Sequence, residues 1–96
     1  MTEKRTYLIT GGTGSFGNAV VKRLLVGTTR EVRVFSRDEK KQDDMRRLYK
    51  NERLKFYIGD VRDVDSLRQA MVGVDYVFHA AALKQVPSCE FFRLVS

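Results

Sequence analysis

The sequence predicts an α/β fold: a doubly wound parallel sheet of about four strands, with three to four helices. Along the 96 residues, short β-branched apolar runs alternate with longer segments whose apolar residues recur at helical spacing. A glycine-rich turn follows the first apolar run and precedes the first helical segment. Together these observations predict βαβ units with right-handed crossovers and helices on both faces of the sheet.

Each element follows from its own local pattern. The chain alternates predicted strands at 6–10, 31–36, 54–58 and 75–80 with predicted helices at 15–26, 38–49 and 63–72. Gly27 and Gly73 are expected to end the first and third helices, and Asp63 to cap the start of the third. The second helix is highly charged, and Met45 and Leu48 form its sparse apolar side.

The C-terminal segment predicts exposed apolar surface. The fourteen residues after Ala82 include Phe91, Phe92, Leu94 and Val95, which is too little chain to form a covering element. A four-stranded parallel sheet would then leave one edge and part of one face open. We therefore expect a homo-oligomer, formed through strand edges or through packing of the aromatic tail between copies.

Composition excludes several classes of protein. Hydrophobic residues at 43% and charged residues at 31% are typical of a globular chain, and no apolar stretch approaches the roughly 20 residues that cross a bilayer. With no signal peptide visible, we expect a cytoplasmic protein. A single cysteine, Cys89, and a single histidine exclude a disulfide framework and the usual zinc sites. The net charge of +6 fits an acidic partner, but acids interleaved through residues 37–55 argue against nucleic acid.

The glycine-rich turn is the first candidate binding element. It fits G-x-G-x-x-G through Gly12, Gly14 and Gly17, and G-x-x-G-x-x-G when read from Gly11. Early glycines permit the sharp turn, Gly14 lets the backbone approach a pyrophosphate, and Gly17 lets the helix pack closely on the sheet. The free N–H groups at the helix start would bind the phosphates.

The tip of the second strand indicates which dinucleotide binds. An NAD site needs an acidic residue about 20 positions after the glycines, to bind the ribose 2′-hydroxyl. This chain has Ser36 and Arg37 there, a hydroxyl donor and a guanidinium that suit a 2′-phosphate. Lys40 and Lys41 follow closely enough to assist, so NADP is favoured over NAD. The alternative is that Arg37 pairs with a neighbouring acid on the surface and Asp38 serves an NAD ribose.

The ends of the third and fourth strands carry further candidates. Asp60 can accept from the adenine amino group with the Val61 backbone beside the ring, or it can merely help to cap the next helix. The small residues at 80–82 would let the cofactor lie against backbone, and Lys84 beyond them would meet a phosphate or hydroxyl. His79 is interpreted as a strand-edge residue hydrogen-bonded to the backbone rather than as an acid–base catalyst.

Four sequence motifs follow one another along the chain: TGGTGSFG, SRDEKKQDD, FYIGDVRD and VFHAAALKQVPSCEFF. With these motifs, residues 7–92 closely resemble the extended short-chain dehydrogenase/reductase group of bacterial polysaccharide biosynthesis. The resemblance implies a Rossmann fold that holds NADP or NAD, removes hydride from C4 of a UDP-hexose and later returns it. The first expectation is a UDP-N-acetylglucosamine 4,6-dehydratase/5-epimerase of capsule or surface polysaccharide. The alternatives are a UDP-glucose or UDP-N-acetylglucosamine 4-epimerase and, from another class, a non-catalytic dinucleotide-binding module.

The resemblance also assigns residues by position. It implies that the glycine turn lines the pyrophosphate, that Ser36 to Lys41 hold the 2′-phosphate, and that Lys84 reaches both cofactor and substrate. The expected cofactor-binding residues are Gly11, Thr13, Gly14, Ser15, Phe16, Gly17, Ser36, Arg37, Asp38, Glu39, Lys40, Lys41, Asp60, Val61, Ala80, Ala81, Ala82 and Lys84.

The family's catalytic Asp–Lys pair, its Tyr-x-x-x-Lys and its substrate domain lie beyond residue 96. We therefore expect residues 1–96 to be the N-terminal part of an NAD(P)-binding Rossmann domain, without an assigned catalytic or metal-binding residue. Such a chain, whether a fragment or the product of an interrupted reading frame, is expected not to turn over a sugar substrate alone.

Overall fold

A five-stranded sheet with helices on both faces forms the protein in this computed structural model, which describes residues 4–11, 13–80 and 83–95. The strands are β1 (Thr6–Thr10), β2 (Glu31–Ser36), β3 (Leu54–Ile58), β4 (Tyr76–His79) and β5 (Lys84–Pro87). The helices are α1 (Ser15–Val26), α2 (Glu39–Tyr49), α3 (Val64–Met71) and α4 (Ser88–Val95). The strand order is β3-β2-β1-β4-β5, so β1 lies at the centre of the sheet.

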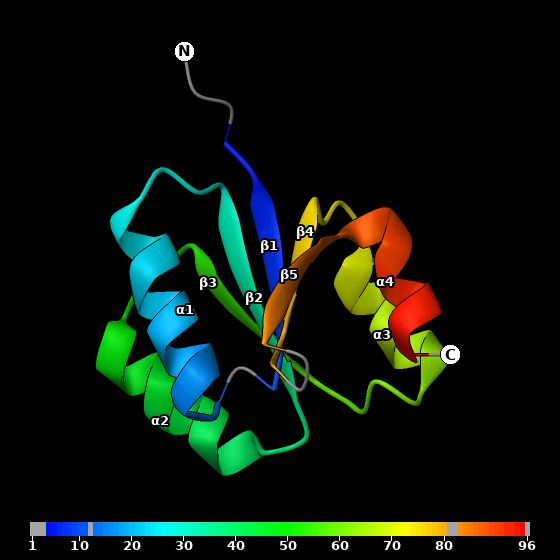
Figure 1. Ribbon diagram of the computed structural model, residues 1–96. Helices are drawn as coiled ribbons and strands as arrows, with labels where there is room; N and C mark the ends of the chain where they lie inside the picture. Colours follow the sequence, from blue (N-terminus) through cyan, green and yellow to red (C-terminus); the bar gives the residue numbers. More distant parts are fainter. Residues whose placement is uncertain (1–3, 12, 81–82, 96) are drawn as a thin grey trace.

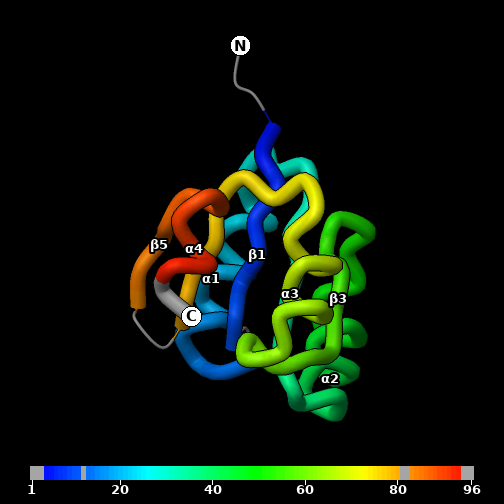
Figure 2. Tube along the Cα trace, turned by 90° about the vertical axis from the view of Figure 1, so that its right-hand side faces the viewer, coloured from blue at the N-terminus to red at the C-terminus, as the bar shows by residue number. Residues whose placement is uncertain are grey.

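The first four strands run parallel, as the sequence predicts, whereas β5 pairs antiparallel with β4. Helices α1 and α2 cover one face of the sheet, and α3 and α4 cover the other (Figure 1). Figure 2 looks onto the second of these faces, where α3 and α4 lie on either side of β1. The carboxyl ends of β1 to β4 meet at one edge, which is where doubly wound sheets bind ligands.

Two separate cores form because successive residues of a strand point to opposite faces. Leu8 lies in the core beneath α3 and α4, while its neighbour Ile9 lies in the core beneath α1 and α2. On β2, Phe35 and Val34 divide in the same way. All four side chains are at most 1% exposed, so each interior strand anchors both layers of helices.

The predicted bounds of β1, β2, β3 and α1 are confirmed, and the two remaining predicted helices start one residue later. The reason is capping: the Asp38 carboxylate accepts from the Lys41 N–H at 3.0 Å, and Asp63 accepts from the Asp65 N–H at 3.2 Å. Met45 is buried as expected. Leu48 is 72% exposed, so its assignment to the apolar side of α2 is wrong.

The C-terminal segment differs most from the prediction. Residues 84–87 return alongside β4 as β5, and α4 then packs on the sheet with Phe91 fully buried. The His79 and Phe91 rings meet edge-on, with centroids 5.3 Å apart. The four predicted parallel strands are present, and β5 adds a fifth, antiparallel strand that the sequence did not predict. The prediction of an uncovered Phe91 is wrong, because the last residues form α4, which packs on the sheet. The side chains of Leu94 and Val95 lie outside the described part.

Two arginines, Arg33 and Arg53, have a structural role. Arg33 on β2 donates to the Ala70 and Val72 carbonyls at the end of α3, at 2.8 and 2.6 Å, and forms an ion pair with Glu31. Arg53 donates to carbonyls that follow α1, including that of Gly27 at 2.9 Å. These guanidinium groups satisfy carbonyls that a helix end leaves without partners. None of the helices in the described part of the chain could span a bilayer.

Candidate functional site

A groove of about 530 Å³ opens at the carboxyl edge of the sheet, between the ends of β1, β2, β3 and β4. It is lined by Thr10, Gly11, Phe35, Ser36, Arg37, Gly59, Asp60, Val61, Arg62, His79 and Ala80. Next to it, a second hollow of about 590 Å³ is lined by Thr13, Ser36, Arg37, Asp38 and Glu39. The two hollows share Ser36 and Arg37, so they form one extended surface around the tip of β2.

The glycine turn joins β1 to α1 at this edge. Gly11 adopts a φ of +69°, which favours glycine, and its N–H donates to the Phe35 carbonyl at 2.9 Å. A Cβ on Gly11 would lie 3.2 Å from that of Ala80, so the turn passes close to the end of β4. Gly14 caps α1 without a side-chain hydrogen bond, which leaves the first N–H groups of the helix available to an anion.

Asn18 stabilises this turn through its side chain. The sequence analysis did not identify it. Its side-chain Nδ2 donates to the carbonyls of Thr13 and Gly14 at 3.2 and 3.1 Å, from the second turn of α1. Of the other predicted residues of the turn, Ser15 is exposed, Phe16 is half-buried and Gly17 is buried within the helix. Gly12 of the motif lies outside the described residues.

The residues predicted to determine the preference for NADP over NAD lie at the tip of β2. Ser36 is 8% exposed, whereas Arg37 projects into solvent with 73% of its side chain exposed. Arg37 pairs with Asp60 at 3.6 Å, rather than with an acid next to it in the sequence. Lys40 and Lys41 are exposed in the first turn of α2, and neither is among the residues lining the two hollows.

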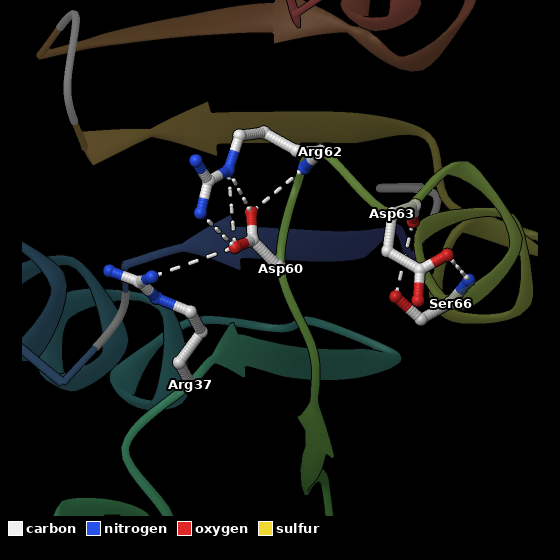
Figure 3. Close-up of polar contacts among 5 residues, drawn as sticks. All are labelled: Arg37, Asp60, Arg62, Asp63 and Ser66. Carbon is white, nitrogen blue, oxygen red and sulfur yellow. Dashed lines mark hydrogen bonds and ion pairs between the residues drawn. The ribbon is translucent and has the colours of Figure 1, made fainter.

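Asp60 lies between two guanidinium groups (Figure 3). Arg62 donates from its backbone N–H at 2.9 Å and from its guanidinium at 2.8 Å, and Arg37 approaches from the tip of β2. The hydrogen bonds from Arg62, aided by both positive charges, lower the pKa of Asp60 from 3.8 to about 2. Asp60 is therefore an ionised, paired carboxylate, and it is Asp63 that caps α3.

Arg62 is a second cation of the groove that the sequence analysis missed. Its side chain is 78% exposed and lies beside Asp60 and Val61 at the end of β3. The only sequence signal was an arginine two positions after an aspartate at a predicted strand end.

The hydrogen bond of His79, at the end of β4, differs from the predicted one. His79 was expected to bond to the backbone, but its Nδ1 shares a hydrogen bond of 2.7 Å with the buried Thr10 hydroxyl. Partial burial, and secondarily the charge of Lys84, lower the pKa of His79. Ala80 lines the groove as predicted; Ala81 and Ala82 lie outside the described residues. Lys84 is exposed on β5 and lines neither hollow.

The groups at this edge are suited to binding phosphate. It offers backbone N–H groups, a serine hydroxyl and two exposed guanidinium groups, all of which favour phosphate. Within the described residues, no cluster of three or more His, Cys, Asp or Glu side chains can hold a metal ion.

Known proteins match nearly the whole chain. A family profile described as "Polysaccharide biosynthesis protein" matches residues 7–95. Two curated relatives, from Rickettsia akari (strain Hartford) and Rickettsia canadensis (strain McKiel), are both named UDP-glucose 4-epimerase and are 64% and 63% identical over 94 residues. Each match covers 94% of this chain and 28% of the relative. The chain thus spans a little over a quarter of the length of these proteins.

Solved structures agree with the fold. The X-ray structure of Pen from Bacillus thuringiensis superposes with a TM-score of 0.77 at 38% identity, covering 96% of this chain and 29% of that one. A short-chain dehydrogenase/reductase family oxidoreductase from Burkholderia thailandensis gives a TM-score of 0.69 at 29% identity, covering 79% and 31%. The structural neighbours are therefore Rossmann-like proteins of the short-chain dehydrogenase/reductase class.

Proposed function

Since this chain belongs to the polysaccharide biosynthesis protein family, we propose that it is the cofactor-binding N-terminal part of a nucleotide-sugar 4-epimerase. The names of the relatives, UDP-glucose 4-epimerase, support this reading over the 4,6-dehydratase/5-epimerase that we expected first. The substrate proposed for the whole enzyme is a UDP-hexose.

A dinucleotide cofactor follows from the fold of the family, and we propose that it is NADP. The described residues fit such a group: the groove and its neighbouring hollow extend from the glycine turn that precedes α1 to the end of β3. A dinucleotide held by these residues would supply hydride transfer from and back to C4 of the sugar in the whole enzyme. The observation that supports this proposal most directly is that Ser36 and Arg37 line both hollows.

Each part of the edge has its own binding role in this proposal. The glycine turn and the start of α1 bind the pyrophosphate through N–H groups. Ser36 and Arg37 bind the 2′-phosphate, and the Asp60–Val61 segment lies along the adenine. Because Asp60 is already held by two arginines, it contributes by fixing Arg37 and Arg62 at the groove as well as by accepting from the base.

Titration calorimetry of the 96-residue chain with NADP and with NAD tests this function. We expect both to bind, with NADP at least about tenfold tighter, because one charge-assisted hydrogen bond corresponds to roughly 1.5–3 kcal/mol. No conversion of UDP-glucose is expected from this chain. Absence of binding by either dinucleotide would overturn the proposal, and tighter binding of NAD would overturn the cofactor choice.

A homo-oligomer also remains part of the proposal. The edge strand β3 has no partner beyond β2 within the described chain, and Ile58 at its end is 54% exposed. An open edge of this kind can pair with another copy.

A further inference from the structure

Gln42 is a buried amide in an otherwise charged helix. It is 1% exposed, although its neighbours on α2 are mostly lysine, arginine and aspartate. Its Nε2 donates to the Ser36 hydroxyl oxygen at 2.9 Å and to the Tyr57 carbonyl at 2.9 Å. The side chain therefore joins α2 to the ends of β2 and β3, directly behind the tip that lines both hollows.

The surrounding main chain fixes which way this amide faces. The Tyr57 carbonyl, and the Ser36 carbonyl at 3.4 Å, can only accept hydrogen bonds. The opposite orientation would set the amide oxygen of Gln42 against two carbonyl oxygens, so the NH₂ group must face them. The Ser36 hydroxyl, on the same side, therefore has to accept from Gln42.

This contact decides what Ser36 offers to a ligand. Its hydroxyl oxygen accepts from Gln42 at 2.9 Å and from the Asp38 N–H at 3.4 Å, which uses both lone pairs. Only the hydroxyl proton is left, so Ser36 acts as a donor. A phosphate monoester accepts such a bond, whereas a ribose 2′-hydroxyl also needs an acceptor for its own proton, which Ser36 no longer supplies.

We propose that Gln42 is a positioning residue that sets the preference for a 2′-phosphorylated adenosine by holding Ser36 as a hydrogen-bond donor. This inference rests on the proposed function, in which the edge binds a dinucleotide. Gln42 itself does not touch the ligand. Its effect should therefore appear in the ratio of NADP to NAD affinity, and it should require the Ser36 hydroxyl.

A double-mutant cycle tests this dependence. Calorimetry would compare NADP and NAD binding to the wild-type chain, Gln42→Leu, Ser36→Ala and the double variant. Each single variant should lower the NADP/NAD affinity ratio about tenfold, the effect of losing one hydrogen bond to a charged group. The double variant should lower it no further. Gln69→Leu, the same change at an exposed position of α3, is the matched control and should leave the ratio unchanged.

A measurement on the wild-type chain covers the case in which Gln42→Leu does not fold. In NMR spectra, the side-chain amide protons of Gln42 should shift with adenosine 2′,5′-bisphosphate and stay in place with 5′-AMP. Equal shifts with both nucleotides would overturn the inference. So would an unchanged ratio in a folded Gln42→Leu chain, or a further fall in the double variant. If the wild-type chain binds neither dinucleotide, the proposed function itself fails. If it binds both and the NADP/NAD ratio does not change in a folded Gln42→Leu chain, only the inference about Gln42 fails.

Discussion

Arg37 is the residue on which the cofactor proposal depends most directly. Its side chain is 73% exposed and its ion pair with Asp60 is long at 3.6 Å, so the guanidinium is available to a phosphate. Arg37→Ala should weaken NADP binding by about 1.5–3 kcal/mol, the range for a hydrogen bond to a charged group, and leave NAD binding nearly unchanged. Calorimetry with both dinucleotides measures this. Arg47→Ala, which removes a similarly exposed arginine paired with Asp43, is the control; equal losses for both variants would contradict a specific contact.

Asp60 gives a pH dependence with a definite sign. Because its pKa falls from 3.8 to about 2 on folding, the folded state binds its proton less readily than the unfolded state. Its contribution to stability is thus complete above pH 3.8 and disappears as the pH falls to about 2. Thermal unfolding from pH 6 to 2 should show Asp60→Asn less stable than wild type at pH 6, with the gap closing over that window. A gap that stays constant down to pH 2 would contradict the pairing with Arg62.

Gly59 shows how tightly the end of β3 packs on its neighbours. A Cβ there would lie 2.8 Å from both the ring of Phe35 and the hydroxyl of Ser66. Phe35 is 1% exposed and has little room to move. Gly59→Ala should therefore destabilise the chain by about 1–3 kcal/mol, as overpacking does. Gly27→Ala is the matched control, because its Cβ would meet only the Leu24 carbonyl at 3.7 Å. Urea unfolding compares the two variants, and equal midpoints would refute the argument.

Helix α4 depends on one aromatic side chain. Phe91 is fully buried against the sheet, whereas Phe92 beside it is only partly covered. Phe91→Ala should cost about 3–5 kcal/mol, the usual range for a large buried aromatic side chain. Phe92→Ala should cost clearly less. Hydrogen exchange of α4 and β5 provides a second readout, since both should lose protection together in Phe91→Ala; if Phe92→Ala were the more damaging, the packing described for α4 would be wrong.

Local patterns predicted β1, β2, β3 and α1 with their bounds because apolar periodicity and glycine turns determine them. They did not predict β5, since residues 84–87 become a strand only through pairing with the edge of β4. The same distinction, between local pattern and contacts made only in the fold, applies to the residues of the candidate site. Ser36, Arg37 and Asp60 follow from topology, which brings strand ends together. Gln42 could not be predicted, because its role lies in a bond to Tyr57, fifteen positions away, and in burial that a charged helix does not suggest.

At the scale of the whole molecule, we predict that the chain associates with further copies of itself. Burial of Phe91 removes this side chain as a contact between copies, and the parallel edge strand β3 is the edge that we expect to pair. We expect sedimentation at tens of micromolar to show a species larger than 11.1 kDa that dissociates on dilution. A concentration-independent monomer would contradict this expectation.

The antiparallel strand β5 also has a consequence for the order in which the chain folds. His79 pairs with Lys84, only a few positions further along, whereas the contact of Thr10 with His79 spans 69 positions. A hairpin closes in about 1–10 μs, and longer loops are slower to close because they lose more chain entropy. The hairpin can therefore shield one edge of β4 before β1 arrives at the other. Lysine and proline on its outer strand disfavour pairing of that new edge with another chain while the rest of the sheet forms.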